Sequence, residues 1–228
     1  MKPILLATSA LAGFFAARWL TSRQNAPAET TEPPPNDVGE ITRNFLMYAV
    51  LPVWLAAGIA DWACHRQTGI ETTTGAKESL MHLLMLAEAA TPVLAGMFFE
   101  ITSPILALMI VSALLHDATA LWDVSYAVTL REVTPIEQHV HSFLEIVPLA
   151  AVAFTAILHW PQLVALFGIG GHRPDWRIRR KRRPLPTRYV ALMLGAQISL
   201  EWLPYLEELL RTVTPQARAA QAVRAARG

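Results

Sequence analysis

The chain has little cysteine and little charge, and each shortage excludes a class of protein. Cys64 is the single cysteine among 228 residues, so neither an internal disulfide nor a CxxC-type metal knuckle can form. Charged residues make up only 16% of the chain, whereas hydrophobic residues make up 53% and the mean hydropathy is +0.33. An ordinary soluble domain is less apolar than this. The sequence also lacks a GxGxxG or Walker-type loop and an internal repeat, so it does not indicate a nucleotide-binding or solenoid fold.

Apolar runs of bilayer length predict an all-α, multi-pass transmembrane helical bundle, with a five-helix body and an N-terminal anchor helix. Residues 1–20 have the character of an anchor, a cleaved signal peptide being the alternative, and a Pro-rich tether follows at 21–36. The bundle is expected over 37–210, and the Ala/Arg-rich tail 211–228 is expected to be a surface helix or disordered. The predicted body spans are 37–66, 77–101 with a bend at Pro92, 104–128, 134–159 and 189–210, with an interfacial turn at 162–170.

The segment TPIEQHVHSFLE, residues 134–145, fixes where the last but one of these spans begins. Thr134 and Glu137 have the spacing of a capping box, and the intervening proline suits the first helical position. Glu137, His141 and Glu145 recur every fourth residue and therefore share a face, whereas His139 points elsewhere. Apolar residues follow directly, so these ionisable groups lie at one end of a membrane span.

Other spans carry similar groups near their ends. A carboxylate and an imidazole lie four residues apart in Asp61 with His65 and in Glu78 with His82. Because consecutive spans run antiparallel, these pairs are expected to meet in one leaflet. A charged group at the bilayer centre costs about 2.5 to 3.5 kcal/mol, so the pairs need compensation by one another, by water or by metal.

A divalent metal would neutralise several carboxylates and accept neutral imidazoles, so iron or zinc, as one ion or two, is the expected cofactor. Glu88, which lies deeper, and Glu145 are the candidates for catalytic proton transfer. Each group also has a purely structural alternative. Glu137 could be a capping residue only, and Asp61 and His65 could form a solvated helix end. The deeper histidines could be structural hydrogen-bonding groups. The candidate metal ligands are Asp61, His65, Glu78, His82, His116, Asp117, Asp123, His139, His141 and Glu145.

The arginines and lysines predict the orientation. Eight of the 19 fall between Arg173 and Arg188, and the positive-inside rule places this basic loop, 172–188, in the cytoplasm. The candidate site then faces the periplasm. Four arginines in the tail, on the periplasmic side by the same count, oppose this orientation. The loop is also expected to attract anionic lipid, and nucleic acid is not an expected partner. The sequence does not indicate an oligomeric state.

A resemblance to a known protein family rests on four segments of the sequence: DWACHR, ETTTGAKES, LLHDATALWDVSYA and TPIEQHVHSFLE. The body, residues 41–210, resembles a family of multi-pass bacterial inner-membrane proteins, members of which sometimes carry a diguanylate cyclase label. The resemblance implies a membrane helical bundle in the bacterial inner membrane and supplies no activity. The chain has no GGDEF-type segment, so the label has no support in this sequence.

Three functions are compatible with these patterns. The first is a metal-dependent redox or hydrolytic enzyme with its site in the periplasmic leaflet. The second is a proton- or ion-coupled transporter that uses the same carboxylates and histidines, and the third is a membrane scaffold in which the polar cluster is structural.

Overall fold

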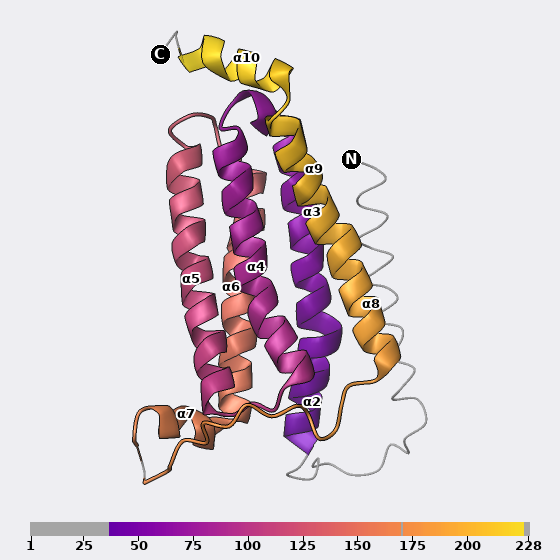
Figure 1. The fold of residues 1–228 in the computed structure, drawn as a ribbon, viewed down its shortest axis with the longest axis vertical. Helices are drawn as coiled ribbons and strands as arrows, with labels where there is room; N and C mark the ends of the chain where they lie inside the picture. Colours follow the sequence, from indigo (N-terminus) through magenta and orange to yellow (C-terminus); the bar gives the residue numbers. More distant parts are fainter. Residues whose placement is uncertain (1–36, 170, 226–228) are drawn as a thin grey trace.

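The computed structural model of the chain describes residues 37–169 and 171–225. These residues form long helices packed side by side, and their β structure is limited to one isolated bridge between Phe99 and Arg180 (Figure 1). The predicted all-α helical bundle is therefore confirmed. The predicted anchor, 1–20, and tether, 21–36, lie outside the described residues.

Five long helical rods make up the described body, two of them interrupted by a π turn, and short helices cover the ends of the bundle. The first rod is α2 (Asp37–Phe45), η1 (Leu46–Val50) and α3 (Leu51–Thr68); the next three are α4 (Ala76–Phe98), α5 (Ser103–Ala127) and α6 (Pro135–Leu158); and the fifth is α8 (Thr187–Gln197), η3 (Ile198–Trp202) and α9 (Leu203–Thr212). The short helices are η2 (Ile70–Thr72), α7 (Trp160–Leu166) and α10 (Pro215–Ala225).

Four of the rods are long and apolar enough to cross a membrane, as judged over the described residues: Val38–Thr68, Ala76–Phe98, Ser103–Ala127 and Pro135–Leu158. Large apolar side chains point outward from them, among them Leu121, Ile136 and Ile157, which are 70%, 69% and 63% exposed. Such a surface suits lipid and not water. The fifth rod, Thr187–Thr212, runs along the others in Figure 1 but falls short of the same apolar threshold.

The helix boundaries follow local chemistry. Both bonds of the Thr134–Glu137 capping box are present at the start of α6, as the sequence predicts. At the end of α3, Gly69 adopts φ 64°, the left-handed conformation that favours glycine, and its N–H bonds to the His65 carbonyl. The chain can therefore turn sharply into η2 and return as α4.

A proline explains each π turn. Its ring would clash with the carbonyl four residues earlier. That carbonyl belongs to Tyr48 for Pro52 and to Leu200 for Pro204, and both lie inside a π turn. The wider turn moves the carbonyl away from the ring and lets each rod continue. As a result η3 carries Glu201 into the bundle, where its side chain is only 2% exposed.

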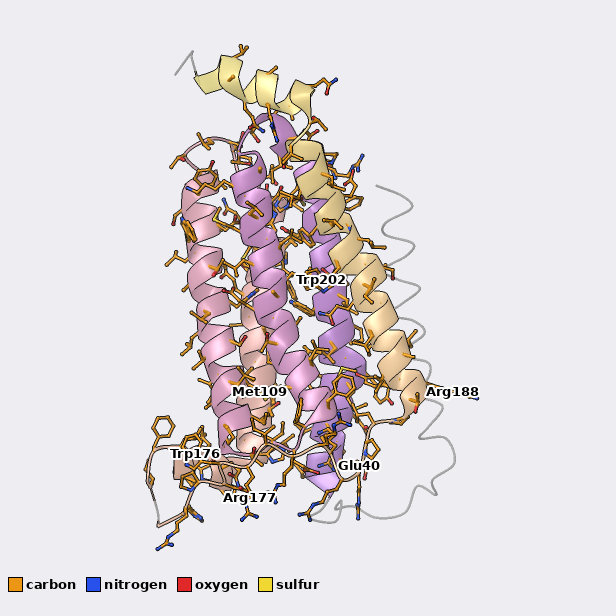
Figure 2. The ribbon with its side chains drawn as sticks, viewed as in Figure 1. Glu40, Met109, Trp176, Arg177, Arg188 and Trp202 are labelled. Carbon is orange, nitrogen blue, oxygen red and sulfur yellow. The ribbon has the colours of Figure 1, made fainter. Side chains whose placement is uncertain are left out.

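The basic loop crosses the end of the bundle opposite α10 and is held there by main-chain bonds. Glu100 N–H donates to the Arg179 carbonyl at 2.9 Å, and Lys181 N–H donates to the Phe98 carbonyl at 2.9 Å. Figure 2 labels Trp176 and Arg177 on this loop at the lower end of the molecule, with Glu40 and Arg188 at the same end. The loop is thus fixed to the turn between α4 and α5.

We expect Gly58→Ala to destabilise the bundle, because a Cβ at this position would lie 2.0 Å from Glu201 Oε2. Overpacking a filled interior costs about 1 to 3 kcal/mol. The matched control is Gly195→Ala, where an added Cβ has no neighbour within 4 Å. Thermal unfolding in detergent should show a lower Tm for the first variant only. A second change, Glu201→Ala, should restore part of the loss; equal Tm values for the two glycine variants would contradict this packing.

Candidate metal centre

A cluster of buried ionisable side chains fills the end of the bundle beneath α10. It combines the end of α3, the start of α4, the end of α5, the start of α6, the α5–α6 loop and the η3–α9 segment (Figure 1). Each member is no more than 9% exposed. The members are Asp61, His65, Glu78, His82, Asp123, Arg131, Glu137, His141, Glu201, Tyr205 and Glu208.

Glu208, fully buried on α9, holds the two central histidines. Its Oε2 lies 3.1 Å from His65 Nδ1 and its Oε1 lies 2.8 Å from His82 Nδ1. The two imidazole rings stack in parallel, with centroids 4.3 Å apart and planes 1° apart. An ionised carboxylate only accepts hydrogen bonds, so both Nδ1 atoms donate to it. When such a ring is neutral, it presents the lone pair of Nε2 on its other side.

Those Nε2 atoms face carboxylates and not donors. His65 Nε2 lies 3.4 Å from Glu137 Oε1, and His82 Nε2 lies 3.5 Å from Asp123 Oδ2. Both nitrogens are buried without a hydrogen-bond partner among the described residues, as are both oxygens of Asp123. Two acceptors that face each other in a dry interior need a proton or a metal ion between them.

Asp61 anchors a third histidine. His141 Nε2 lies 2.8 Å from Asp61 Oδ1, while the Tyr205 hydroxyl donates to Asp61 Oδ2 at 2.9 Å. His65 Nδ1 lies 3.6 Å from the same Oδ2. Asp61 therefore joins α3 to α6 and α9 at the level of the stacked histidines.

Arg131, from the loop between α5 and α6, pairs with two acids at once. Its guanidinium donates to both oxygens of Glu78 and to both oxygens of Glu137. Burial lowers the pKa of Arg131, but its hydrogen bonds to Glu137 and Glu78 outweigh burial, so the net direction is upward and the side chain stays charged. Glu137 consequently has two roles, since it also completes the capping box of α6.

Within residues 37–169 and 171–225, three groups of side chains are close enough to share a metal ion, with ligand atoms within 4.8 Å of one another. The middle group shares His65 with the first and His82 with the last, whereas the first and last have no residue in common. Up to two ions could therefore be held without using a residue twice. The groups are Asp61–His65–His141, His65–His82–Glu208 and Glu78–His82–Asp123.

The separations within the cluster suit a metal. Two ligand atoms that each lie about 2.1 Å from a tetrahedral zinc are roughly 3.4 Å apart. His82 Nε2 is 3.5 Å from Asp123 Oδ2 and 4.0 Å from Glu78 Oε1, so small shifts would complete such a shell. Beside these groups lies a cavity of about 50 Å³, lined in part by Asp61, Asp123 and Glu145.

The charge of the cluster also favours a bound cation. It contains six carboxyl groups against one guanidinium and three imidazoles. Carboxylates outnumber cations even if every imidazole is protonated, and two stacked imidazolium rings would repel each other. Arg131 is the only Lys or Arg among the buried side chains of the described part of the chain. A divalent ion would reduce the excess of negative charge.

The structure brings six of the sequence-derived ligands together and leaves the others apart. Asp61, His65, Glu78, His82, Asp123 and His141 lie in the cluster. Glu145, half-buried, lines the cavity beside it.

The remaining candidates lie elsewhere. His116 also lines the cavity, but its two ring nitrogens lie 3.1 Å from the Met85 and Leu144 carbonyl oxygens, which leaves neither free for a metal. Glu88 accepts a hydrogen bond from Thr119 at 3.1 Å. Asp117 is half-buried on α5 and belongs to none of the three groups. His139 is exposed and packs edge-on to Phe143.

Sequence reasoning missed Glu208, Tyr205 and Arg131. Glu201, Tyr205 and Glu208 follow one another at spacings of four and three, which is the signature of one helical face. That signal is readable in the sequence. Arg131 has no such signal, because it lies in a loop and reaches the acids only through the tertiary fold.

Comparison of the chain with protein-family profiles, with curated proteins and with solved structures finds no match. The function is therefore inferred from the geometry and chemistry of the site.

We expect Arg131→Met to destabilise the protein strongly, because it leaves Glu78 and Glu137 buried without their cation. Breaking a buried pair from one side costs about 3 to 5 kcal/mol. The control is Arg66→Met, which removes an exposed pair with Glu207 that contributes roughly 0 to 1 kcal/mol. Denaturant titration of both variants in detergent measures the difference. Losses of equal size would show that Arg131 does not compensate the acids.

Proposed function

We propose that this protein is an integral membrane metalloprotein whose buried centre binds a divalent iron or zinc ion, as one ion or two. The expected ligand sets are Asp61–His65–His141 and Glu78–His82–Asp123, in which His65 and His82 would bind through Nε2 because Nδ1 of each ring contacts Glu208. Glu137, whose Oε1 is 3.4 Å from His65 Nε2, would lie beside the first set. The first offers two imidazoles and one carboxylate, a donor set that both non-haem iron and catalytic zinc use. The second is richer in carboxylate and suits the same hard or borderline ions.

One observation carries the proposal: the Nε2 atoms of His65 and His82 are buried, make no hydrogen bond among the described residues and face carboxylate oxygens at 3.4 and 3.5 Å. A polar atom without a partner is costly in a membrane interior, because no bulk water can satisfy it. A cation between each Nε2 atom and the carboxylate oxygen that it faces would give both atoms a partner.

Glu208 supports the proposal from the opposite side of the rings. Metal-binding histidines usually donate their second ring N–H to a carboxylate, which fixes the tautomer and the ring orientation and makes the ligand more basic. Here a single carboxylate does so for two histidines from different helices. Glu208 is thus an orienting residue and not a ligand in the proposed arrangement.

A metal in this position would supply either Lewis acidity or a redox centre. The chain's own contribution would be to exclude water, to hold the ligands, and to move protons through Glu145, which lines the adjoining cavity. We propose further that the protein resides in the bacterial inner membrane with the basic loop 172–188 in the cytoplasm. In that orientation the metal centre faces the periplasm.

We expect protein purified in detergent to contain one or two equivalents of iron or zinc, and His82→Ala to lose at least half of it, because His82 belongs to two of the three groups. Elemental analysis measures the content, and an absorption spectrum separates iron from colourless zinc. His139→Ala is the matched control, since His139 is exposed and should change nothing. A wild-type content below about 0.2 equivalents of every transition metal, or equal loss in both variants, would refute the proposal.

The neighbouring glutamates Glu207 and Glu208 allow a second test. Glu208→Gln keeps the shape but removes the shared carboxylate, and loss of an orienting partner typically weakens metal affinity by about 10- to 100-fold. Glu207→Gln should leave affinity unchanged, because Glu207 pairs with Arg66 and Arg211 on the surface of α9. Competition with a metal chelator measures both. Equal affinities for the two variants would remove Glu208 from the centre.

A further inference from the structure

A second, larger cavity lies in the other half of the bundle, toward the basic loop. It has a volume of about 170 Å³ and is enclosed by the first rod, α4 and α6, with contributions from Met109 on α5 and Tyr189 on α8. Most of its wall is apolar. The apolar lining includes Leu46, Val50, Trp54, Val93, Val147 and Leu158.

The charged groups of this wall are all basic. Arg43 on α2, His159 at the end of α6 and Lys181 in the basic loop line the cavity together. The side chains of Arg43 and Lys181 make no hydrogen bond or ion pair with any residue in the described ranges. Glu100, the acid whose charge acts on His159 and Lys181, accepts a hydrogen bond from the Arg182 main-chain N–H at 2.7 Å. The cavity therefore has an apolar body and an under-compensated positive end.

The electrostatics of these basic groups agree with that description. Burial, and after it the charges of Lys181 and Arg43, lower the pKa of the His159 imidazole, and Glu100 opposes them only in part. Burial likewise lowers the pKa of Lys181; Glu100 opposes it and Arg43 adds to it. An anion at this end would relieve the repulsion between Arg43 and Lys181 and would favour the protonated form of His159.

We propose that this cavity binds a single-chain amphiphile with an anionic head group, such as a fatty acid, with the head beside Arg43, His159 and Lys181 and the chain directed along the apolar wall toward Trp54. Charge complementarity selects the head group, and the apolar wall selects the chain. The proposal does not depend on the metal centre.

The size of the cavity limits the chain. A water molecule needs about 10 to 15 Å³ of such space, and a methylene group is of similar bulk, so 170 Å³ accommodates on the order of ten methylene groups. A chain of that length would end near Trp54. This residue lines both cavities, so it separates the proposed chain from the polar cluster.

Trp54 provides the reporter for the test. The ligand is 11-bromoundecanoate, whose bromine at the chain end quenches tryptophan at short range, titrated into the purified full chain in a neutral detergent with EDTA present. We expect saturable quenching that Trp54→Phe removes in large part. The methyl ester, which has the same chain without the charge, should bind on the order of tenfold more weakly. Equal binding of acid and ester, or quenching that Trp54→Phe does not change, would overturn the proposal.

Matched variants separate this site from general surface charge. Arg43→Gln with Lys181→Gln should weaken binding by on the order of tenfold or more, at roughly 1 kcal/mol for each cation near the membrane surface. Arg183→Gln with Arg188→Gln removes two exposed arginines from the same loop, neither of which lines the cavity, and should have little effect. Equal weakening in the two double variants would reduce the effect to surface electrostatics. Displacement of the bromo acid by phosphatidylglycerol as readily as by laurate would assign the site to a bilayer phospholipid and overturn the single-chain assignment.

Discussion

The hydrogen bonds of Glu208 to His65 and His82 are the contacts on which the rest of the polar centre depends. They connect α9 to α3 and α4 in the interior of the bundle, where an unpaired carboxylate would be costly. They also decide which nitrogen of each ring is free. With Nδ1 engaged on both rings, the two Nε2 atoms must point away from α9 and toward the acids of α5 and α6. The Glu208 carboxylate thus determines the direction in which both Nε2 atoms point.

Around that contact the cluster has two kinds of compensation. Arg131 neutralises Glu78 and Glu137 near the membrane surface with a fixed, permanently charged group. Deeper in the bundle, Asp61, Asp123 and Glu208 have only histidines and Tyr205 beside them. In the inner half a metal ion could therefore take the place of protons, whereas the outer half is compensated by a permanent charge. The other half of the bundle contains an apolar core cluster and the apolar cavity.

The sequence was sufficient to predict the helices and the side of the bundle on which the polar groups meet. Apolar length predicts the spans, the Thr134–Glu137 spacing predicts the start of α6, and i to i+4 pairs such as Asp61 with His65 predict which groups share a face. It was not sufficient to separate His82, whose ring is in the centre, from His116, whose nitrogens contact main-chain carbonyls. Both are histidines within apolar helices, and their depth and the rotation of each helix about its axis together distinguish them. That rotation is set by packing between helices, which no local pattern encodes.

In the fifth rod, the π turn decides which side chains face the interior of the bundle together. In a regular α-helix, side chains four residues apart drift by about 40° at each step, so four such steps would carry a residue about 160° around the axis. Yet Tyr189, Met193, Gln197, Glu201 and Tyr205 are all buried, at 6%, 3%, 6%, 2% and 5% exposure. The wider turn at Ile198–Trp202 cancels part of the drift and keeps a strict four-residue repeat on one seam. Tyr189 on this seam lines the larger, apolar cavity, and Glu201 and Tyr205 line the smaller cavity beside the polar cluster. The π turn that precedes Pro204 therefore places both cavities against the same edge of one helical rod.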